Sequence, residues 1–171
     1  MTTSLRSVAP LLFALIASSS CFGQAANTQT APSPPPPPYG APISLQEAHK
    51  IVEAAEVEAN KQGWPVAIAV VDSAGYLVLF HRLDNTQLGS VEVAIEKAKT
   101  SALFRRPTKA FEETIAKGAE NLKILKLPGA TPIEGGLPII VGGKLVGAIG
   151  VSGVKSTEDA QVATAGLAAL K

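Results

Sequence analysis

The chain has 171 residues with 14 acidic and 15 basic side chains, and its formal net charge is +1. Arg6 is the only charged residue before position 43, so the remaining part, of about 129 residues, holds 14 acidic and 14 basic side chains and is neutral. A part of this size fits one domain and excludes a two-domain chain. Its neutrality excludes the broad positive surface of a nucleic-acid-binding protein.

The uncharged start of the chain has the three-part pattern of a secretory signal. A short basic segment ends at Arg6, an apolar run covers 8–17, and small residues follow. The apolar run is about half the roughly twenty residues that span a bilayer. We therefore interpret residues 1–23 as a signal peptide, with cleavage after Gly23 or Ala25. We expect a periplasmic or secreted protein without a transmembrane segment in its mature form. An uncleaved anchor is the alternative.

Cys21 is the only cysteine, and its place at the end of the apolar run allows lipidation as a second fate. The three serines before it lack the leucine of a usual lipobox. Because the predicted domain holds no cysteine, disulfides and thiol catalysis are excluded for it. Residues 24–42 include five consecutive prolines at 34–38. They are predicted to form a disordered, extended linker without a core, serving as a spacer rather than as a ligand for a proline-binding module.

The predicted domain, residues 43–171, begins with a helix and a hairpin. Ser44 and Glu47 have the spacing of a capping box, and apolar residues recur at helical intervals until Gly63. Two β-strands are predicted over 66–71 and 76–83, because β-branched and apolar runs flank a short turn.

Two further helices are predicted over 90–104 and 108–117, followed by a long surface loop over 121–132. Besides its core stripe, the helix over 90–104 has a second stripe of mixed character. That stripe consists of Val93, Lys97, Thr100 and Phe104. It is either solvated or lines a pocket or a subunit contact.

The chain ends with a second hairpin over 137–141 and 144–151, and with an alanine-rich helix capped by 156–159 and running towards Leu170. Paired hairpins, rather than alternating strands and helices, predict an α+β domain instead of a Rossmann fold. In this domain a central, mainly antiparallel sheet of two hairpins is packed by helices.

Local motifs of catalysis and phosphate binding are missing from the sequence. The glycines between 142 and 153 form neither a P-loop nor a dinucleotide fingerprint, and no serine has the context of a nucleophile elbow. His49 and His81 are too few for a protein-only zinc site unless carboxylates complete it, although one neutral imidazole is enough to ligate haem iron. Hydrogen-bonded structural roles for both histidines are the alternative.

Several segments, in the right order along the chain, resemble the GlcG/HbpS family. They are 43–48 and 65–75, then 80–84, which reads Phe-His-Arg-Leu-Asp, then 89–90 and 97–104, and finally 135–139, 147–153 and 159–170. The resemblance implies a small haem-binding or haem-interacting domain, related to the C-terminal domain of PduO-type corrinoid proteins. It also implies assembly into homo-oligomers.

Residues that match the family signature are implied to line a ligand site. They are Arg82, Asp84, Lys97, Thr100, Phe104, Glu134, Gly135 and Gly136. In this interpretation Phe104 and the glycine edge accept a flat tetrapyrrole, while Arg82 and Lys97 meet its propionates through charge-assisted hydrogen bonds. His49 or His81 is the candidate axial ligand of the haem iron. Because aromatic residues are few, we expect a surface or interface site rather than an enclosed one.

We therefore expect an exported haem-binding module that senses or sequesters haem and has no turnover reaction of its own. One alternative is a protein that binds a small organic acid between Arg82 and Lys97. The other is a haem-degrading enzyme. A homo-oligomer is also expected from the residues, because the apolar strands and the alanine-rich last helix give flat surfaces to bury.

Overall fold

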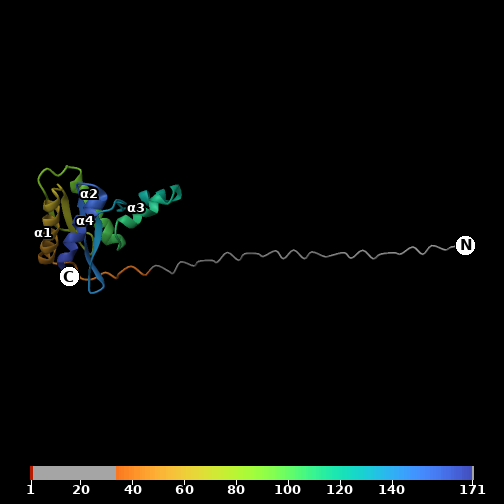
Figure 1. Cartoon of the computed structure of the whole chain (residues 1–171). Helices are drawn as coiled ribbons and strands as arrows, with labels where there is room; N and C mark the ends of the chain where they lie inside the picture. The colour runs from red at the N-terminus through yellow and green to blue at the C-terminus, as the bar shows by residue number, and fades with distance from the viewer. Residues whose placement is uncertain (2–33, 171) are drawn as a thin grey trace. The chain divides into compact units, whose positions relative to one another are not determined.

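The computed structural model describes Met1 and residues 34–170 (Figure 1). The predicted signal peptide, Cys21 and the first part of the predicted linker lie outside the described residues. The elements are α1 (Leu45–Gln62), β1 (Ala67–Asp72), β2 (Leu77–Arg82), α2 (Ser90–Phe104), α3 (Lys109–Ala116), η1 (Ala119–Lys126), β3 (Gly136–Val141), β4 (Lys144–Ser152), α4 (Ser156–Leu167) and η2 (Ala168–Leu170), where η marks a 3-10 helix.

The four strands form one antiparallel sheet in the order β2-β1-β4-β3. Both predicted hairpins are present, and each forms one half of the sheet. In the centre, Ile68 of β1 pairs with His81 on one side and with Val151 on the other. The predicted α+β class is confirmed, and no strand end differs from its predicted position by more than one residue.

Helices cover both faces of the sheet. The core on one face includes buried residues of α1 and α4, such as Ile51 and Val162. On the other face α2 contributes Ala94, Ala98 and Ala102 to a second, alanine-rich core. A side chain at Gly150 of β4 would collide with the backbone of α2 at Ala94 and Ala98. The helix therefore lies directly on the backbone of the sheet. The narrow space between them is filled by small side chains, mostly alanine, with few aromatic residues.

The ends of α1 are fixed as predicted. The backbone N–H of Glu47 donates to Oγ of Ser44 at 3.2 Å, while the Ser44 N–H donates to the Glu47 carboxylate at 3.0 Å. Gly63 ends the helix at a φ of +69°, a left-handed conformation that glycine adopts without strain. The capping of α4 differs from the prediction, because the N-cap is Lys155, whose N–H donates to Glu158.

The predicted loop over 121–132 is wrong in its first half, where the 3-10 helix η1 occupies Ala119–Lys126. None of its residues is buried. It therefore lacks the buried apolar face whose regular spacing allows a helix to be recognised in a sequence. Figure 1 shows α3 and η1 extending away from the sheet, and Leu122 and Leu125 on this extension are about half exposed. We refer to residues 109–126 as the arm.

The last residues of the segment interpreted as a linker pack on the domain. Leu145 of β4 donates its N–H to the carbonyl of Pro38 at 2.9 Å, and Gly40 donates to the Leu145 carbonyl at 2.7 Å. The hydroxyl of Tyr39 donates to the carbonyl of Leu103 at 2.9 Å, and the guanidinium of Arg105 lies 5.0 Å from the Tyr39 ring centroid. We call residues 38–42 the strap.

Within the part of the chain that the structure describes, no helix combines the length and the apolar character needed to cross a membrane.

Candidate functional site

The side chain of His81 faces α1, where a carboxylate binds it. Its Nδ1 lies 2.7 Å from Oε1 of Glu56, and the two side chains are 35% and 26% exposed. When Nδ1 carries the proton and donates it to the carboxylate, Nε2 keeps its lone pair. The pair therefore presents an imidazole nitrogen that can act as a metal ligand at the partly exposed junction of α1 and β2.

The second histidine lies at the same place. His49 precedes Glu56 by seven residues on α1, so that the two residues share one face of the helix. The ring centroids of His49 and His81 are 6.5 Å apart, and the rings are inclined by 70°. The fold thus brings together the only two histidines of the sequence, which are 32 positions apart.

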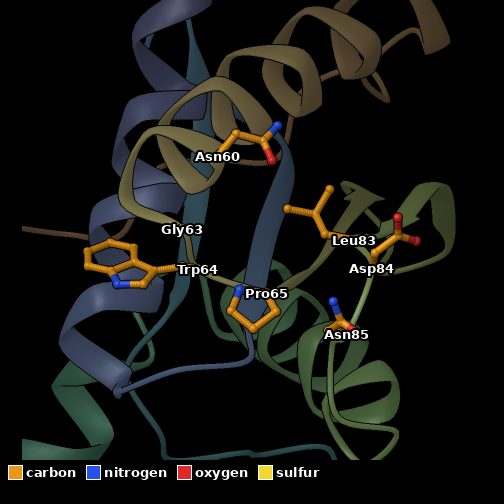
Figure 2. Close-up of a pocket in the computed structure, with 7 residues that line it drawn as sticks. All are labelled: Asn60, Gly63, Trp64, Pro65, Leu83, Asp84 and Asn85. Atoms are coloured by element: carbon orange, nitrogen blue, oxygen red, sulfur yellow. The ribbon is translucent and has the colours of Figure 1, made fainter.

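A cavity of about 340 Å³ lies at the C-terminal end of α1 (Figure 2). It is lined by Asn60, Gly63, Trp64, Pro65, Leu83, Asp84 and Asn85. Asn60 follows Glu56 by four residues, so the two lie on the same face of α1. Leu83 follows His81 by two residues, so these two lie on the same side of the sheet. The cavity therefore continues the two faces that carry the Glu56–His81 pair. Figure 2 shows the side chains of Asn60 and Leu83 facing each other, while Trp64 points to the other side. The candidate site is therefore the Glu56–His81 pair, His49 and this neighbouring cavity.

The chemistry of the cavity is mixed. Pro65 and Leu83 give it an apolar wall, and Asp84 is the one charged residue among those that line it. The backbone N–H of Leu83 donates to the carbonyl of Val66 at 3.0 Å, which extends the β1–β2 ladder beyond the end of β2 and fixes the wall. The cavity volume is at the lower end of the roughly 300–1,000 Å³ typical of ligand sites.

Lys97 occupies a different, closed environment. It is 1% exposed, and its Nζ donates to Oδ2 of Asp159 at 2.8 Å and to the carbonyl of Val151 at 3.0 Å. Burial raises the pKa of the Asp159 carboxyl, although the hydrogen bond and the charge of Lys97 act in the opposite direction. The ammonium group is thus fully engaged inside the domain.

Gly135 packs against this ion pair, and Gly136 packs against the backbone of Lys97 and the side chain of Thr108. A Cβ at Gly135 would lie 2.8 Å from Nζ of Lys97, and the residue has a φ of +125°. The N–H of Gly136 donates to Oγ1 of Thr108 at 2.9 Å. Gly135 is therefore required by the close approach of Lys97, Val151 and Asp159, and Gly136 by the close approach of α2 and Thr108.

Thr100 and Phe104 hold neighbouring segments. The hydroxyl of Thr100 donates to the carbonyl of Gly129 at 3.0 Å and accepts the N–H of Thr131 at 2.8 Å. Phe104 packs edge-on against Phe111, with ring centroids 5.2 Å apart. Because Lys97 and Thr100 are buried, the mixed stripe of α2 is not solvated at these positions.

Glu134 links the same region to α3. Its carboxylate lies 3.0 Å from Nζ of Lys109, and its backbone N–H donates to the Glu112 carboxylate at 2.6 Å. The hydrogen bond and charge of Glu134 raise the pKa of Lys109.

The structure thus divides the predicted site residues between two places. One group gathers around α2 and the start of α3, and it comprises Lys97, Thr100, Phe104, Glu134, Gly135 and Gly136. Asp84 lies at the cavity, and Arg82 is exposed at the end of β2. His49 lies on α1, and the side chain of His81 faces that helix. Arg82 is thus exposed, whereas the ammonium of Lys97 is bound to Asp159 inside the domain.

Glu56 and Asn60 were not among the sequence-predicted site residues. A signal for them existed, because His49, Glu56 and Asn60 are spaced by seven and four residues along one helix, which places them on one face. Asp159 had no comparable signal, since its partner Lys97 is 62 positions away. Among the described residues, no three His, Cys, Asp or Glu side chains are grouped so that they could hold a metal ion.

Comparisons with known proteins agree on one family. The family described as "Haem degrading protein HbpS-like" matches residues 43–168. Protein GlcG of Escherichia coli strain K12 is 41% identical over 110 residues, covering 64% of this chain and 81% of that protein. A crystal structure of HbpS superposes with a TM-score of 0.70 and 34% identity, covering 77% of this chain and 92% of the other. A crystal structure of a PduOC:haem complex has a TM-score of 0.69 and 25% identity, covering 75% and 95%.

Proposed function

The chain belongs to the HbpS-like family, and we propose that it is a haem-binding module in which His81 is the axial ligand of the haem iron. The observation that carries this proposal is the contact of 2.7 Å between Nδ1 of His81 and Oε1 of Glu56. Metal-ligating histidines almost always donate their second ring N–H to a carboxylate, a backbone carbonyl or water. The Glu56–His81 pair has this arrangement, with Nε2 as the remaining nitrogen.

The donor set of this side of the domain fits a haem group. His81 offers one neutral nitrogen, which is sufficient for haem iron, and the wall of Pro65 and Leu83 offers an apolar surface beside it. A tetrapyrrole is larger than the adjacent cavity of about 340 Å³, so we propose a site on the surface or between two copies of the chain. When bound, haem supplies a redox-active iron, while this chain supplies the ligand and the apolar surface.

A solved relative supports the choice of ligand. The PduOC structure is described as a haem complex, and it shares 25% identity and the fold with this chain. We further propose that the protein is exported, which the basic, apolar and small-residue pattern of residues 1–23 supports, and that it senses or sequesters haem outside the cytoplasm. Cell fractionation of the full-length protein tests the export proposal, and recovery only with cytoplasmic proteins would overturn it.

Arg82 is the proposed partner for a haem propionate. It is exposed and follows His81 on the edge strand β2, but its side chain starts from the opposite face of the sheet. A guanidinium forms strong paired hydrogen bonds with a carboxylate, so Arg82 meets a propionate by reaching around this free edge or across to a haem shared with a second copy of the chain. Lys97 could join it only after losing Asp159, because its ammonium is already bound inside the domain. The same contact argues against a small organic acid held jointly by Arg82 and Lys97.

Assembly of several copies is part of the proposal. Leu122, Leu125 and Leu127 are between 40% and 57% exposed on the arm or just after it. Apolar side chains gathered in this way are buried most readily by a second copy of the chain. Analytical ultracentrifugation at working concentration tests the proposal, and a monomer would refute it.

Absorption spectroscopy tests the haem proposal. The protein without residues 1–23 is titrated with haem, and His81→Ala and His49→Ala are treated alike. We expect a shifted Soret band for the wild type and for His49→Ala, and loss of that shift for His81→Ala. No shift in the wild type at micromolar haem would remove the proposal. Loss of the shift only in His49→Ala would transfer the ligand role to His49.

Haem degradation is a second candidate, favoured by the description of the matching family. The haem-loaded protein is incubated with a reductant and oxygen. Disappearance of the Soret band together with released iron and a linear tetrapyrrole would establish it, whereas a stable Soret band supports binding alone.

A further inference from the structure

Resting on the proposed haem-binding function, we infer that Glu56 is a positioning residue for His81. Its carboxylate holds the imidazole in the tautomer with the proton on Nδ1, and it orients Nε2 towards the iron. Glu56 lies outside the family signature segments described above, and it is on a different element from the ligand that it serves.

The contacts of Glu56 favour this role. Among the hydrogen bonds and ion pairs of the described residues, His81 is the partner of Glu56, and no lysine or arginine neutralises its charge. Two positions further along α1, Glu58 is engaged by Gln62, Gln161 and Lys61. The negative charge of Glu56 is therefore directed at one imidazole, whereas that of Glu58 is shared within a surface network.

The two side chains are held by rigid elements that are distant in sequence. Glu56 directly follows Ala55, which is completely buried, so the rotation of α1 about its axis is fixed by packing. His81 is paired in the sheet with Ile68, which is also completely buried. A donor and an acceptor fixed in this way lose little additional freedom when they meet, which is the condition for a preorganised ligand.

A carboxylate on Nδ1 changes what Nε2 offers to a metal. It fixes the tautomer and the orientation of the ring, and it increases the basicity of the ligating nitrogen. Loss of such a partner typically weakens metal affinity about 10- to 100-fold. Hydrogen bonding to the axial ligand is also one of the means by which a protein sets the reduction potential of haem.

The first experiment needs no haem. The 15N chemical shifts of the His81 ring are recorded for the wild type, Glu56→Ala and the matched control Glu53→Ala, which removes an exposed carboxylate one turn earlier on α1. In neutral imidazole of the wild type and the control, we expect the proton on Nδ1. In Glu56→Ala, we expect a mixture of the two tautomers. An unchanged tautomer in Glu56→Ala would overturn the inference.

The second experiment measures haem affinity and midpoint potential for the wild type, Glu56→Ala, Glu56→Gln and Glu53→Gln. Glu56→Ala is expected to bind haem about 10- to 100-fold more weakly. Glu56→Gln retains an acceptor but loses the charge, so its midpoint potential is expected to be higher than that of the wild type. Glu53→Gln is expected to match the wild type in both. Melting curves of the apo variants confirm that each is folded.

The outcomes separate the inference from the proposed function. If the wild type binds haem but Glu56→Ala binds it equally well, only the inference fails. If His81→Ala binds haem like the wild type, the assignment of His81 as the axial ligand fails together with the inference, because Glu56 then acts on a residue that is not the ligand. If the wild type binds no haem, the proposed function fails, while the nitrogen shifts still report the tautomer of His81.

Discussion

The ammonium nitrogen of Lys97 lies 2.8 Å from Oδ2 of Asp159, and both side chains are only 2% exposed. The pair joins α2 to α4 across the end of β4, where the carbonyl of Val151 accepts a second hydrogen bond from Lys97 at 3.0 Å. Oδ1 of Asp159 accepts the N–H of Val154 at 3.2 Å, so the carboxylate also holds the segment before α4. A buried pair of this kind is costly to break from one side only.

Lys97→Met should therefore destabilise the domain by about 3–5 kcal/mol, because it leaves the Asp159 carboxylate buried without its partner. The double variant Lys97→Met/Asp159→Leu should recover most of this loss. Lys99→Met on the same helix is the matched control, since Lys99 forms a partly exposed ion pair with Glu96 and should matter little. Urea unfolding measures all three, and equal losses for Lys97→Met and Lys99→Met would contradict the prediction.

The raised pKa of Asp159 predicts a specific dependence of stability on pH. The folded state holds the proton of this carboxyl more tightly than the unfolded chain does. Protonation of Asp159 therefore increases the free energy of unfolding, and this increase is fully present below the ordinary pKa of 3.8. That contribution is lost as the pH rises through the raised pKa of the folded state. The free energy of unfolding of the wild type should thus rise relative to that of Asp159→Asn as the pH falls towards 3.8. A relative decrease over the same window would show that the pKa is lowered instead.

Gly150→Ala should destabilise the domain through a clash between β4 and α2. The added Cβ would lie 2.5 Å from the backbone nitrogen of Ala98, and neither backbone can yield without displacing the helix. Overpacking of this kind typically costs about 1–3 kcal/mol. Gly89→Ala is the control, because nothing lies within 4 Å of a Cβ at that position. Thermal unfolding should show a lower midpoint for Gly150→Ala alone.

Tyr39→Phe should weaken the attachment of the strap. The substitution removes the hydrogen bond from the Tyr39 hydroxyl to the carbonyl of Leu103 but retains the ring that Arg105 contacts. A loss of about 0.5–1.5 kcal/mol is expected. Hydrogen exchange at the Gly40 amide should become faster as well. Tyr76→Phe, at a tyrosine that is 74% exposed, should leave both measurements unchanged.

Leu125→Glu should shift the assembly of the protein towards smaller species. Leu125 is 57% exposed on the arm, and a charge there would oppose burial against another copy. Leu88→Glu provides the comparison, because Leu88 is 77% exposed in the segment before α2. Sedimentation velocity distinguishes the two variants. The same sedimentation profile for Leu125→Glu and the wild type would place the contact elsewhere.

The features that were predicted correctly depend on local signals. The capping box of Ser44 and Glu47 involves neighbours three residues apart, and each hairpin joins strands that are adjacent in the chain. Such patterns are visible in a window of ten or twenty residues. The antiparallel sheet and its helical layers followed from the order of these elements.

The features that were not predicted depend on contacts between distant residues. Lys97 and Asp159 are 62 positions apart, and Glu56 and His81 are 25 positions apart. No periodicity connects such positions, and a lysine on a mixed stripe is as compatible with solvent as with a buried carboxylate. For the same reason the sequence could place Lys97, Gly135 and Gly136 in one ligand site, whereas the structure shows the three residues packed closely against one another inside the domain.

The strap determines where the domain can be separated from the segment that precedes it. Since Leu145 donates to Pro38 and accepts from Gly40, a cut after Gly40 would remove two backbone partners from the start of β4. A cut before Pro38 would leave both bonds and Tyr39 in place. A protease that sheds this domain from an anchored precursor in functional form would thus have to act upstream of Pro38, and the shed product would begin with part of the proline run.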